Sequence, residues 1–336
     1  MRKIVYFFLD ILGINALFRF INRHEAIILW YHGVCADDFT LLKGYDERHI
    51  PQALFRKQLK FLKSCGYTFA TMTELMDTFA QGKNAEKFVV LTFDDGFRNI
   101  VDNAYPVMQK LGAKGCFYLV AGLIGTDQLL WTDHIEMFLR SSRESEFKFI
   151  FQGKPITYTI NTKDLLEAAM RDIKKKLRTI SDKERKEHLR QFVLESVVSV
   201  PKEFLFASWE QIKKLDKNVL EVGCHTQNHP NCEMLDSDEE FREELLNSKR
   251  AIENKVGYDV KHFCYPAGSF NAEVIRHVKE YGYQSAATII PGFNNKNTDP
   301  YVLKRISIEE DFIFFKAITS GSYFFISRLV QRLKGR

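Results

Sequence analysis

Hydrophobic residues along the chain follow two alternating patterns: short, almost wholly apolar runs, and longer segments with helical spacing. The run FVVLTF at 88–93 is typical of a strand buried on both faces of a parallel sheet. Residues 51–66 repeat apolar positions at helical spacing and end at Gly66, a common helix stop. The same patterns predict strands at 26–31, 114–122, 219–226, 261–268, 285–290 and 302–308, and helices at 99–112, 236–257 and 271–282. This alternation predicts an α/β fold built on a parallel barrel or sheet.

Residues 131–205 interrupt this alternation. The stretch 147–160 predicts a hairpin, and 163–198 predicts charged amphipathic helices. We therefore expect an insertion that rises over one face of the barrel or sheet.

The composition is that of an ordinary globular protein. With 336 residues, of which 45% are hydrophobic, the chain can bury a large core, as one extended barrel-like domain or a domain with an insertion. The net charge of +5 comes from the ends, whose basic residues are Arg2, Lys3, Arg19, Arg23, Arg328, Arg332, Lys334 and Arg336. Nothing in this distribution indicates a nucleic-acid-binding face, so no nucleic-acid partner is expected.

The two ends are also amphipathic. Residues 1–24 have a basic start and an apolar run, but Asp10 interrupts the run and no small-residue cleavage site follows, so we do not expect a signal peptide. Asn15 and Arg19 make the segment a poor membrane span. Two interpretations stay open, a helix lying on an anionic membrane surface and a helix packed on the protein's own core. The tail at 321–336 favours the first, because its apolar and basic residues fall on different faces of one helix.

The six cysteines are scattered through the chain without a CxxC pair. This usage favours reduced thiols over a disulfide framework. Together with the amphipathic ends, it predicts a cytoplasmic protein that is peripheral on the inner face of the cell membrane.

Two adjacent carboxylates, Asp94 and Asp95, directly follow the buried strand at 88–93. One interpretation is a plain turn, because Asp-Gly commonly ends a strand. The other is chemistry, because parallel sheets bind ligands at the carboxyl ends of their strands. This motif alone leaves both interpretations open.

A second candidate lies at 221–230, where His225 and His229 are four residues apart at the end of another apolar strand. This spacing puts two imidazoles on one side of a helical turn, within reach of one metal ion. A helix-capping or solvent-facing pair would have the same spacing. The occurrence of both motifs at strand ends of one sheet is what favours a metal site, because two histidines and a carboxylate are a frequent catalytic set.

The motifs TFDDG, CHTQNHP and FCYPAGSFN, in that order on successive strands, resemble those of the polysaccharide deacetylases, the NodB-homology or carbohydrate esterase family 4 fold. The resemblance covers about residues 26–312. It implies a distorted (β/α)7-type barrel that hydrolyses acetyl groups from N-acetylated sugars with one divalent metal ion, usually Zn²⁺. We place this domain at 25–320, with residues 1–24 and 321–336 as amphipathic terminal segments.

The resemblance also implies residue roles. By position, Asp94 is the general base and Asp95 a metal ligand, with His225 and His229 completing the metal site. A bound cation can lower the pKa of water from about 15.7 towards roughly 7, and a positioned base adds about 100- to 10,000-fold in rate. The loop expected to offer a backbone N–H to the oxyanion consists of Tyr265, Pro266, Ala267 and Gly268.

The chain departs from the family pattern in two motifs. Many family members have an Arg in the third motif that orients the base and a hydroxy-aromatic residue before its Gly, where this chain has Cys264 and Ala267. The late histidine segment that normally supplies the acid is also absent. A circularly shifted subset carries this histidine on an N-terminal strand, so we propose His32 as general acid, the alternative being a turn histidine. Arg305, in the predicted substrate and oxyanion set, is a candidate replacement for the missing Arg.

Trp131 and Asp133 open the insertion. One interpretation is that they line the sugar groove. The other is a packed Trp with a helix-capping Asp.

The function that the sequence predicts is a metal-dependent deacetylase acting on an N-acetylhexosamine unit of a glycan or lipid-linked saccharide. One rival is a hydrolase of the same fold acting on another acyl amide or ester. The other is a non-catalytic carbohydrate-binding relative, which the altered motifs favour. The sequence fixes neither the oligomeric state nor the sugar.

Overall fold

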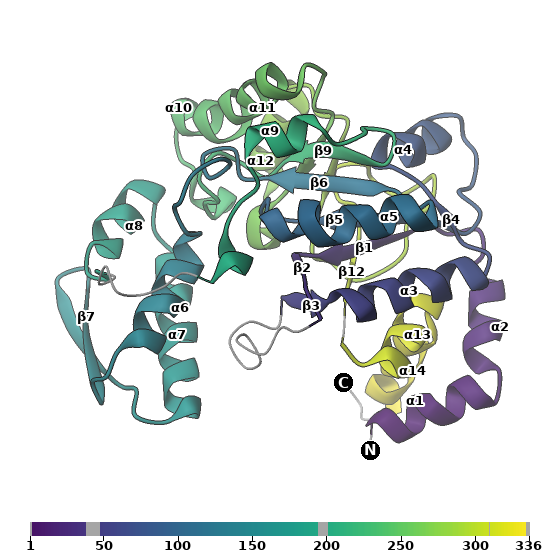
Figure 1. Ribbon diagram of the computed structural model, residues 1–336, viewed down its shortest axis with the longest axis horizontal. Coiled ribbons are helices and arrows are strands. Elements are labelled where there is room, and N and C mark those ends of the chain that lie inside the picture. Colours follow the sequence, from purple (N-terminus) through teal and green to yellow (C-terminus); the bar gives the residue numbers. More distant parts are fainter. Residues whose placement is uncertain (1, 38–47, 194–200, 309, 334–336) are drawn as a thin grey trace.

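A curled parallel sheet forms the centre of the computed structural model, which describes residues 2–37, 48–193, 201–308 and 310–333 (Figure 1). The strand order is β11-β10-β9-β6-β5-β1-β12, and β4 pairs with β5. These strands are β1 (Ile27–Tyr31), β4 (Thr68–Phe69), β5 (Phe88–Phe93), β6 (Gly115–Leu119), β9 (Leu220–Cys224), β10 (His262–Cys264), β11 (Ser285–Ala287) and β12 (Ile306–Ser307). The sheet confirms the predicted α/β fold with a distorted barrel.

Helices cover the outside of the sheet (Figure 1). They are α3 (Gln52–Ser64), α4 (Met72–Ala80), α5 (Tyr105–Leu111), α9 (Trp209–Lys213), α10 (Asp238–Phe241), α11 (Ser248–Val256) and α12 (Ala272–Glu280). Two predicted helices contain π-helical segments, at Ile100–Ala104 before α5 and at Arg242–Asn247 between α10 and α11. Before α5 the cause is local, because Pro106 lacks the N–H that a regular α-helix would pair with Asp102.

The strand register brings the predicted site motifs to one end of the sheet. Tyr31 at the end of β1 pairs with Phe93 at the end of β5, and the N–H of Asp94 donates to the Tyr31 carbonyl. On the next pair of strands, the N–H of His225 donates to the carbonyl of Leu119. Carboxyl ends of parallel strands meet at the same edge, which is where these side chains gather. Nearby, β2 (Gly33–Cys35) and β3 (His49–Pro51) form a separate two-stranded pair.

The insertion forms a lobe with a hydrophobic core of its own. Its elements are α6 (Trp131–Ser141), β7 (Glu146–Phe151), β8 (Lys154–Thr159), α7 (Lys163–Leu177) and α8 (Asp182–Leu189). The lobe core is made of side chains such as Ile135, Phe149, Ile173 and Phe192. The lobe lies beyond the carboxyl end of β6 in Figure 1. Residues 194–200 of the predicted insertion lie outside the described residues.

The two ends of the chain lie side by side (Figure 1). The terminal helices are α1 (Arg2–Ile11), α2 (Ile14–Ile21), α13 (Phe312–Ser320) and α14 (Ser322–Leu333). Tyr6 of α1 packs against Phe314 and Tyr323, and Gly13 with φ 72° separates α1 from α2. Within the described part of the chain, every helix is too short or too polar to cross a bilayer. The predicted basic residues Lys334 and Arg336 lie outside it.

Candidate active site

A carboxylate and two imidazoles form a compact group at the carboxyl end of the sheet. The Nε2 atoms of His225 and His229 each lie 3.6 Å from Oδ1 of Asp95. One potential ligand atom from each residue lies within 4.8 Å of the others, and the two imidazole rings are 4.9 Å apart. The structure therefore brings together the three residues predicted to hold a metal ion.

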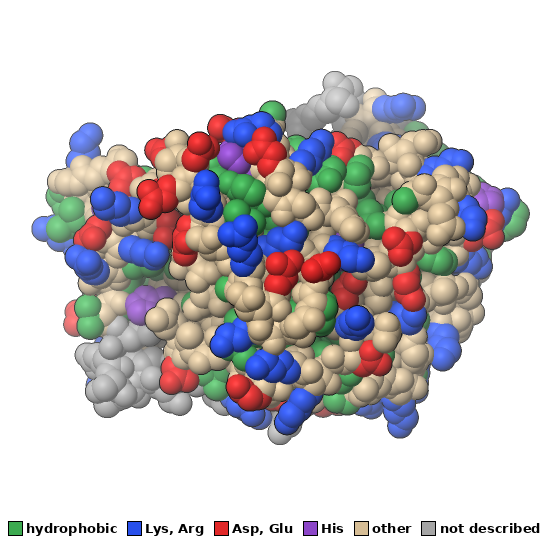
Figure 2. All heavy atoms as spheres, turned by 90° about the horizontal axis from the view of Figure 1, so that it is seen from above, with side chains coloured by type: hydrophobic (Ala, Val, Ile, Leu, Met, Phe, Trp, Pro, Cys, Tyr) green, Lys and Arg blue, Asp and Glu red, His purple; other side chains and the backbone are tan. Residues whose placement is uncertain are grey.

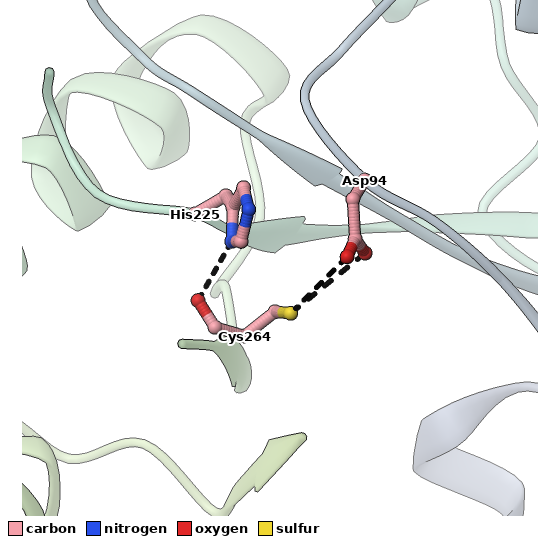
Figure 3. A group of neighbouring side chains, drawn as sticks. All are labelled: Asp94, His225 and Cys264. Atoms are coloured by element: carbon pink, nitrogen blue, oxygen red, sulfur yellow. Dashed lines mark hydrogen bonds between the residues drawn. The ribbon is translucent and has the colours of Figure 1, made fainter. Parts of the chain in front are cut away.

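The two imidazoles are prepared to act as ligands. His225 Nδ1 donates to the backbone carbonyl of Cys264 at 2.7 Å (Figure 3). This bond leaves the Nε2 lone pair to face Asp95. Burial lowers the pKa of His225, and burial together with the neighbouring His225 lowers the pKa of His229 well below its usual value. Both rings are thus neutral at pH 7, the form that binds metal.

The local backbone differs from the helical turn that the spacing predicted. His225 and His229 lie in a loop after β9, where Thr226 has φ 71° and His229 has φ 55°. Left-handed residues reverse the chain, so a folded loop brings the two rings together instead of the rise of a helix. The helical-turn interpretation was wrong, although the two side chains meet.

The adjacent carboxylates face different partners. Asp95 has φ 75°, a conformation that costs a non-glycine residue about 1–3 kcal/mol, and its side chain meets the two histidines. Asp94 instead accepts two hydrogen bonds from Arg305, from Nη1 to Oδ1 at 2.8 Å and from Nη2 to Oδ2 at 2.9 Å. The strained backbone at Asp95 thus separates the two neighbouring acids into two environments.

The Asp94 and Arg305 pair is buried on all sides. Burial alone would raise the pKa of Asp94, but the Arg305 guanidinium more than offsets it, so this pKa lies below its ordinary value. Cys264 Sγ lies 3.7 and 3.6 Å from the two Asp94 oxygens (Figure 3). A cysteine therefore lies where the third motif of the family carries its Arg, and Arg305, directly before β12, supplies a guanidinium to Asp94.

The predicted oxyanion loop offers one backbone donor. The N–H of Tyr265 donates to the Ala287 carbonyl at 3.1 Å, and the N–H of Gly268 donates to the Tyr265 carbonyl at 2.9 Å. Pro266 has no N–H. By elimination, Ala267, whose φ is 52°, is the candidate backbone donor of this loop. The oxyanion role of the loop stays a prediction.

His32 follows β1 at the same end of the sheet. The carbonyl of the preceding residue, Tyr31, accepts from the N–H of Asp94, so His32 lies close to the metal-binding group. Its ring lies 5.0 Å from that of Trp30, and both residues line a cavity of about 470 Å³ together with Arg48. This position is compatible with the predicted general acid, whose role stays a prediction.

Trp131 and Asp133 lie in the first turn of α6 and are 8% and 1% exposed. Trp131 Nε1 donates to the carbonyl oxygen of His229 at 3.1 Å. Asp133 accepts from Arg48 Nη2 at 2.5 Å, and Arg48 Nη1 lies 4.0 Å from Asp95 Oδ2. Asp133 is not the N-cap, which is Leu130. Trp131 also lines a cavity of about 640 Å³, whereas Asp133 is buried against Arg48, so a place in a sugar groove stays a prediction.

Three further residues support the site without a signal in the sequence. Glu244 accepts hydrogen bonds from the backbone N–H groups of Gln227 and Asn228 at 2.9 Å, which holds the loop between the two histidines. Arg185 of the insertion stacks on the Trp131 ring at 4.8 Å. With Arg48, these residues come from charged stretches that look like ordinary solvated helices and loops, so the sequence pattern does not distinguish them.

Comparison with known proteins identifies relatives of this chain. A family model described as polysaccharide deacetylase matches residues 81–286. YxkH of Bacillus subtilis strain 168, which carries a provisional polysaccharide deacetylase name, is 21% identical over 282 residues, covering 84% of this chain and 70% of YxkH. The poly-beta-1,6-N-acetyl-D-glucosamine N-deacetylase of Staphylococcus aureus strain MSSA476 is 27% identical over 114 residues, covering 32% of this chain and only 39% of that protein.

Solved structures share the fold. The Streptococcus pyogenes deacetylase PplD in complex with acetate has a TM-score of 0.57 at 19% identity, over 85% of this chain and 93% of PplD. IcaB from Ammonifex degensii has a TM-score of 0.57 at 19% identity, over 88% of this chain and 97% of IcaB. The family model covers more than half of the chain, and the protein therefore belongs to the polysaccharide deacetylase family.

Proposed function

We propose that the protein is a metal-dependent N-deacetylase that releases acetate from N-acetylhexosamine units of a glycan or lipid-linked saccharide. The observation that carries this proposal is the Asp95, His225 and His229 group beside the buried pair of Asp94 and Arg305. The names of the Staphylococcus aureus and Streptococcus pyogenes relatives, both deacetylases, support it.

The side chains present fit a divalent cation. Two neutral imidazoles and one carboxylate are a donor set that Zn²⁺ favours, and three protein ligands leave a position open for water or substrate. The hydrogen bond from His225 Nδ1 to the Cys264 carbonyl is the kind of support that orients metal-binding histidines. When bound, the cation supplies an acidified water and polarises the acetyl carbonyl. Zinc is our proposal for the native metal.

The protein's own groups then divide the proton transfers. Asp94, ionised because Arg305 pairs with it, accepts a proton from the water whose oxygen attacks the acetyl carbon. We assign the N–H of Ala267 to the stabilisation of the oxyanion that forms. His32 gives a proton to the sugar nitrogen as the C–N bond breaks, so that acetate and a free amino sugar leave.

One alternative, a non-catalytic carbohydrate-binding relative, was suggested by the altered motifs. The guanidinium that the third motif lacks is present on Asp94 through Arg305, which supports a catalytic protein. The other alternative, a hydrolase of another acyl amide or ester, is distinguished from a sugar deacetylase by the following experiment.

The test combines metal analysis with acetate release. Purified protein would be stripped of metal, reloaded with Zn²⁺ and other divalent ions, and assayed on acetylated β-1,4- and β-1,6-linked glucosamine oligomers and on O-acetyl esters. Metal-dependent acetate release from the amido sugars, absent in Asp94→Asn, is the expected result. Activity restricted to the esters, or an equal rate without metal, would contradict the proposal.

For location, we propose the cytoplasm, at the inner face of the cell membrane. All six cysteines are free, four of them on or next to buried strands, which supports a reducing compartment.

A further inference from the structure

The ends of the chain expose an unusual concentration of apolar side chains. Eleven of the sixteen large hydrophobic residues exposed in the described part of the chain lie within residues 5–21 or 325–330. Leu12 is 70% exposed and Phe20 is 61% exposed. We call the exposed faces of α1, α2 and α14 the terminal platform. An exposed apolar area of this kind marks an interaction surface.

The terminal helices are held together by buried polar contacts as well as by the packing of Tyr6, and their other face exposes apolar side chains to solvent. Asp10 accepts from Lys316 Nζ at 2.6 Å, and the Asn15 side chain is fully buried. Asn15 accepts from the Ser322 hydroxyl at 2.7 Å and donates to Asp10 at 3.1 Å. These bonds fix α1 and α2 against the C-terminal helices, so the apolar side chains face outwards in the folded protein. The packed interpretation of the N-terminal helix thus holds for the face that carries Tyr6 and Asn15, and the membrane interpretation stays a prediction for the exposed face.

Basic side chains lie at the edge of the platform. Arg23 lies beside Phe20, with its guanidinium carbon 4.2 Å from the ring centroid, and Arg328 and Arg332 of α14 are exposed. Two acids also lie in this region: Asp10 pairs with Lys316, and Glu25 accepts a hydrogen bond from the side-chain amide of Asn295 at 3.1 Å. Apolar side chains with a basic rim complement an anionic bilayer.

An apolar cavity opens beside the platform. Helices α2 and α14 and the loop at 291–304 enclose about 460 Å³, with Phe18, Phe293 and Phe324 in the walls. Lys304 and Arg328 also line it, and so does Glu25. The aromatic side chains in its walls suit an apolar chain.

The opposite face of the molecule has a different character. Figure 2 shows this face from above, with basic and acidic side chains intermixed and hydrophobic ones in small separate groups. A two-fold interface between copies would bring the basic rims of two platforms towards each other, because a symmetric dimer uses the same patch on both subunits. Charge complementarity therefore favours lipid over a second copy.

We propose that the terminal platform docks this protein on an anionic phospholipid bilayer, with Phe8, Leu12 and Phe20 in the acyl boundary and Arg23, Arg328 and Arg332 at the headgroup phosphates. Helix α13 links this surface to the catalytic end, since its N-cap Asp311 lines the cavity beside His32. The platform would hold the barrel at the membrane independently of catalysis.

The experiment is flotation of the full-length protein, at about 0.1 M salt, with vesicles of phosphatidylcholine alone or of phosphatidylcholine with about 30% phosphatidylglycerol. The double variant Phe8→Ser with Leu12→Ser is expected to lose at least about tenfold in affinity for the anionic vesicles. The matched control, Ile150→Ser with Leu165→Ser, removes two exposed apolar side chains from the insertion and should bind like wild type. Circular dichroism checks that both variants fold.

A second pair of variants tests the basic rim. Arg328→Gln with Arg332→Gln should weaken binding to anionic vesicles by about 25-fold, because each cation at such a surface is worth roughly fivefold. The control Arg171→Gln with Arg190→Gln neutralises two exposed arginines of the insertion and should have no effect. Equal flotation of wild type and Phe8→Ser with Leu12→Ser would overturn the proposal. The proposal would also be overturned if wild type failed to bind vesicles and instead formed a concentration-dependent dimer in sedimentation velocity, and if this variant abolished that dimer.

Discussion

Arg305 holds both carboxylate oxygens of Asp94, at 2.8 and 2.9 Å, although 211 residues separate the two in the chain. The bidentate geometry fixes the orientation of the carboxylate as well as its charge. An aspartate buried this deeply would otherwise hold its proton more tightly, and a base that is already protonated cannot accept another. The pair therefore links the segment that leads into β12 to the predicted proton transfer.

Replacing Arg305 tests this link through pH. In Arg305→Met, burial is no longer offset, so the pKa of Asp94 rises and the acidic limb of kcat/KM moves to higher pH. The variant also leaves a buried carboxylate unpaired, which we expect to cost about 3–5 kcal/mol in the free energy of unfolding. Arg305→Lys keeps the charge without the bidentate contact and should shift the limb less. As a control, Arg276→Met breaks an exposed ion pair with Glu280 and should leave the pH profile unchanged.

The metal ligands and the base should give different phenotypes. Asp95→Asn, His225→Ala and His229→Ala should each lose bound metal, because each removes a ligand atom from a group of three. Asp94→Asn should retain metal and lose at least about 100-fold in turnover, because its carboxylate faces Arg305. Metal content by mass spectrometry and acetate release measure the two properties separately. Metal loss in Asp94→Asn with normal metal in Asp95→Asn would exchange the two assignments.

The sequence predicted the sheet because its strands carry their own signal. FVVLTF and the other apolar runs are buried along nearly their whole length, as a parallel sheet covered by helices requires. It also located both site motifs, since the carboxyl ends of such strands meet. Strand ends thus predicted which residues come together.

The contacts that support the metal-binding group could not be predicted from the sequence, because they depend on tertiary geometry. Trp131 had two open interpretations, and the hydrogen bond to His229 depends on how the insertion docks on the barrel. Glu244 belongs to a run of acids that has the pattern of a solvated helix, and only the left-handed turn at Thr226 brings the loop to it. Such contacts follow from tertiary geometry, which hydrophobic spacing does not encode.

Trp131 provides a test of how the insertion positions the metal-binding loop. Trp131→Phe keeps an aromatic ring under Arg185 and removes the Nε1 donor to the His229 carbonyl. We expect metal affinity to fall about 10- to 100-fold, as for other groups that orient metal ligands, with little change in thermal unfolding of the metal-free protein. Trp209→Phe, in α9, is the matched control. Unchanged metal affinity in Trp131→Phe would limit this residue to packing.

Glu221 predicts a pH dependence of stability away from the site. Burial raises its pKa to about 7, even though Thr73 donates to it from its backbone N–H at 3.0 Å and its hydroxyl at 2.7 Å. The folded state therefore binds this proton more tightly than the unfolded state, so the stability it contributes is present at low pH and is lost as pH rises between about 4.5 and about 7. Glu221→Gln should gain on the order of 3 kcal/mol relative to wild type between pH 4.5 and pH 8. Urea unfolding at both pH values measures it, and a constant difference would contradict the raised pKa.

His32 is the remaining prediction, and the reaction itself offers the readout. A general acid that protonates the departing nitrogen acts in the chemical step and does not hold the metal, so His32→Ala should keep its metal content while turnover on an acetamido sugar falls by about 100-fold or more. An acetyl ester of an acidic phenol needs little help for its leaving group, and the variant should hydrolyse it at nearly the wild-type rate. His24→Ala, which changes a partly exposed histidine before β1, controls for the loss of an imidazole. An equal loss on both substrates would make His32 a structural residue of the β1 end, and unchanged turnover on the sugar would mean that another group supplies the proton.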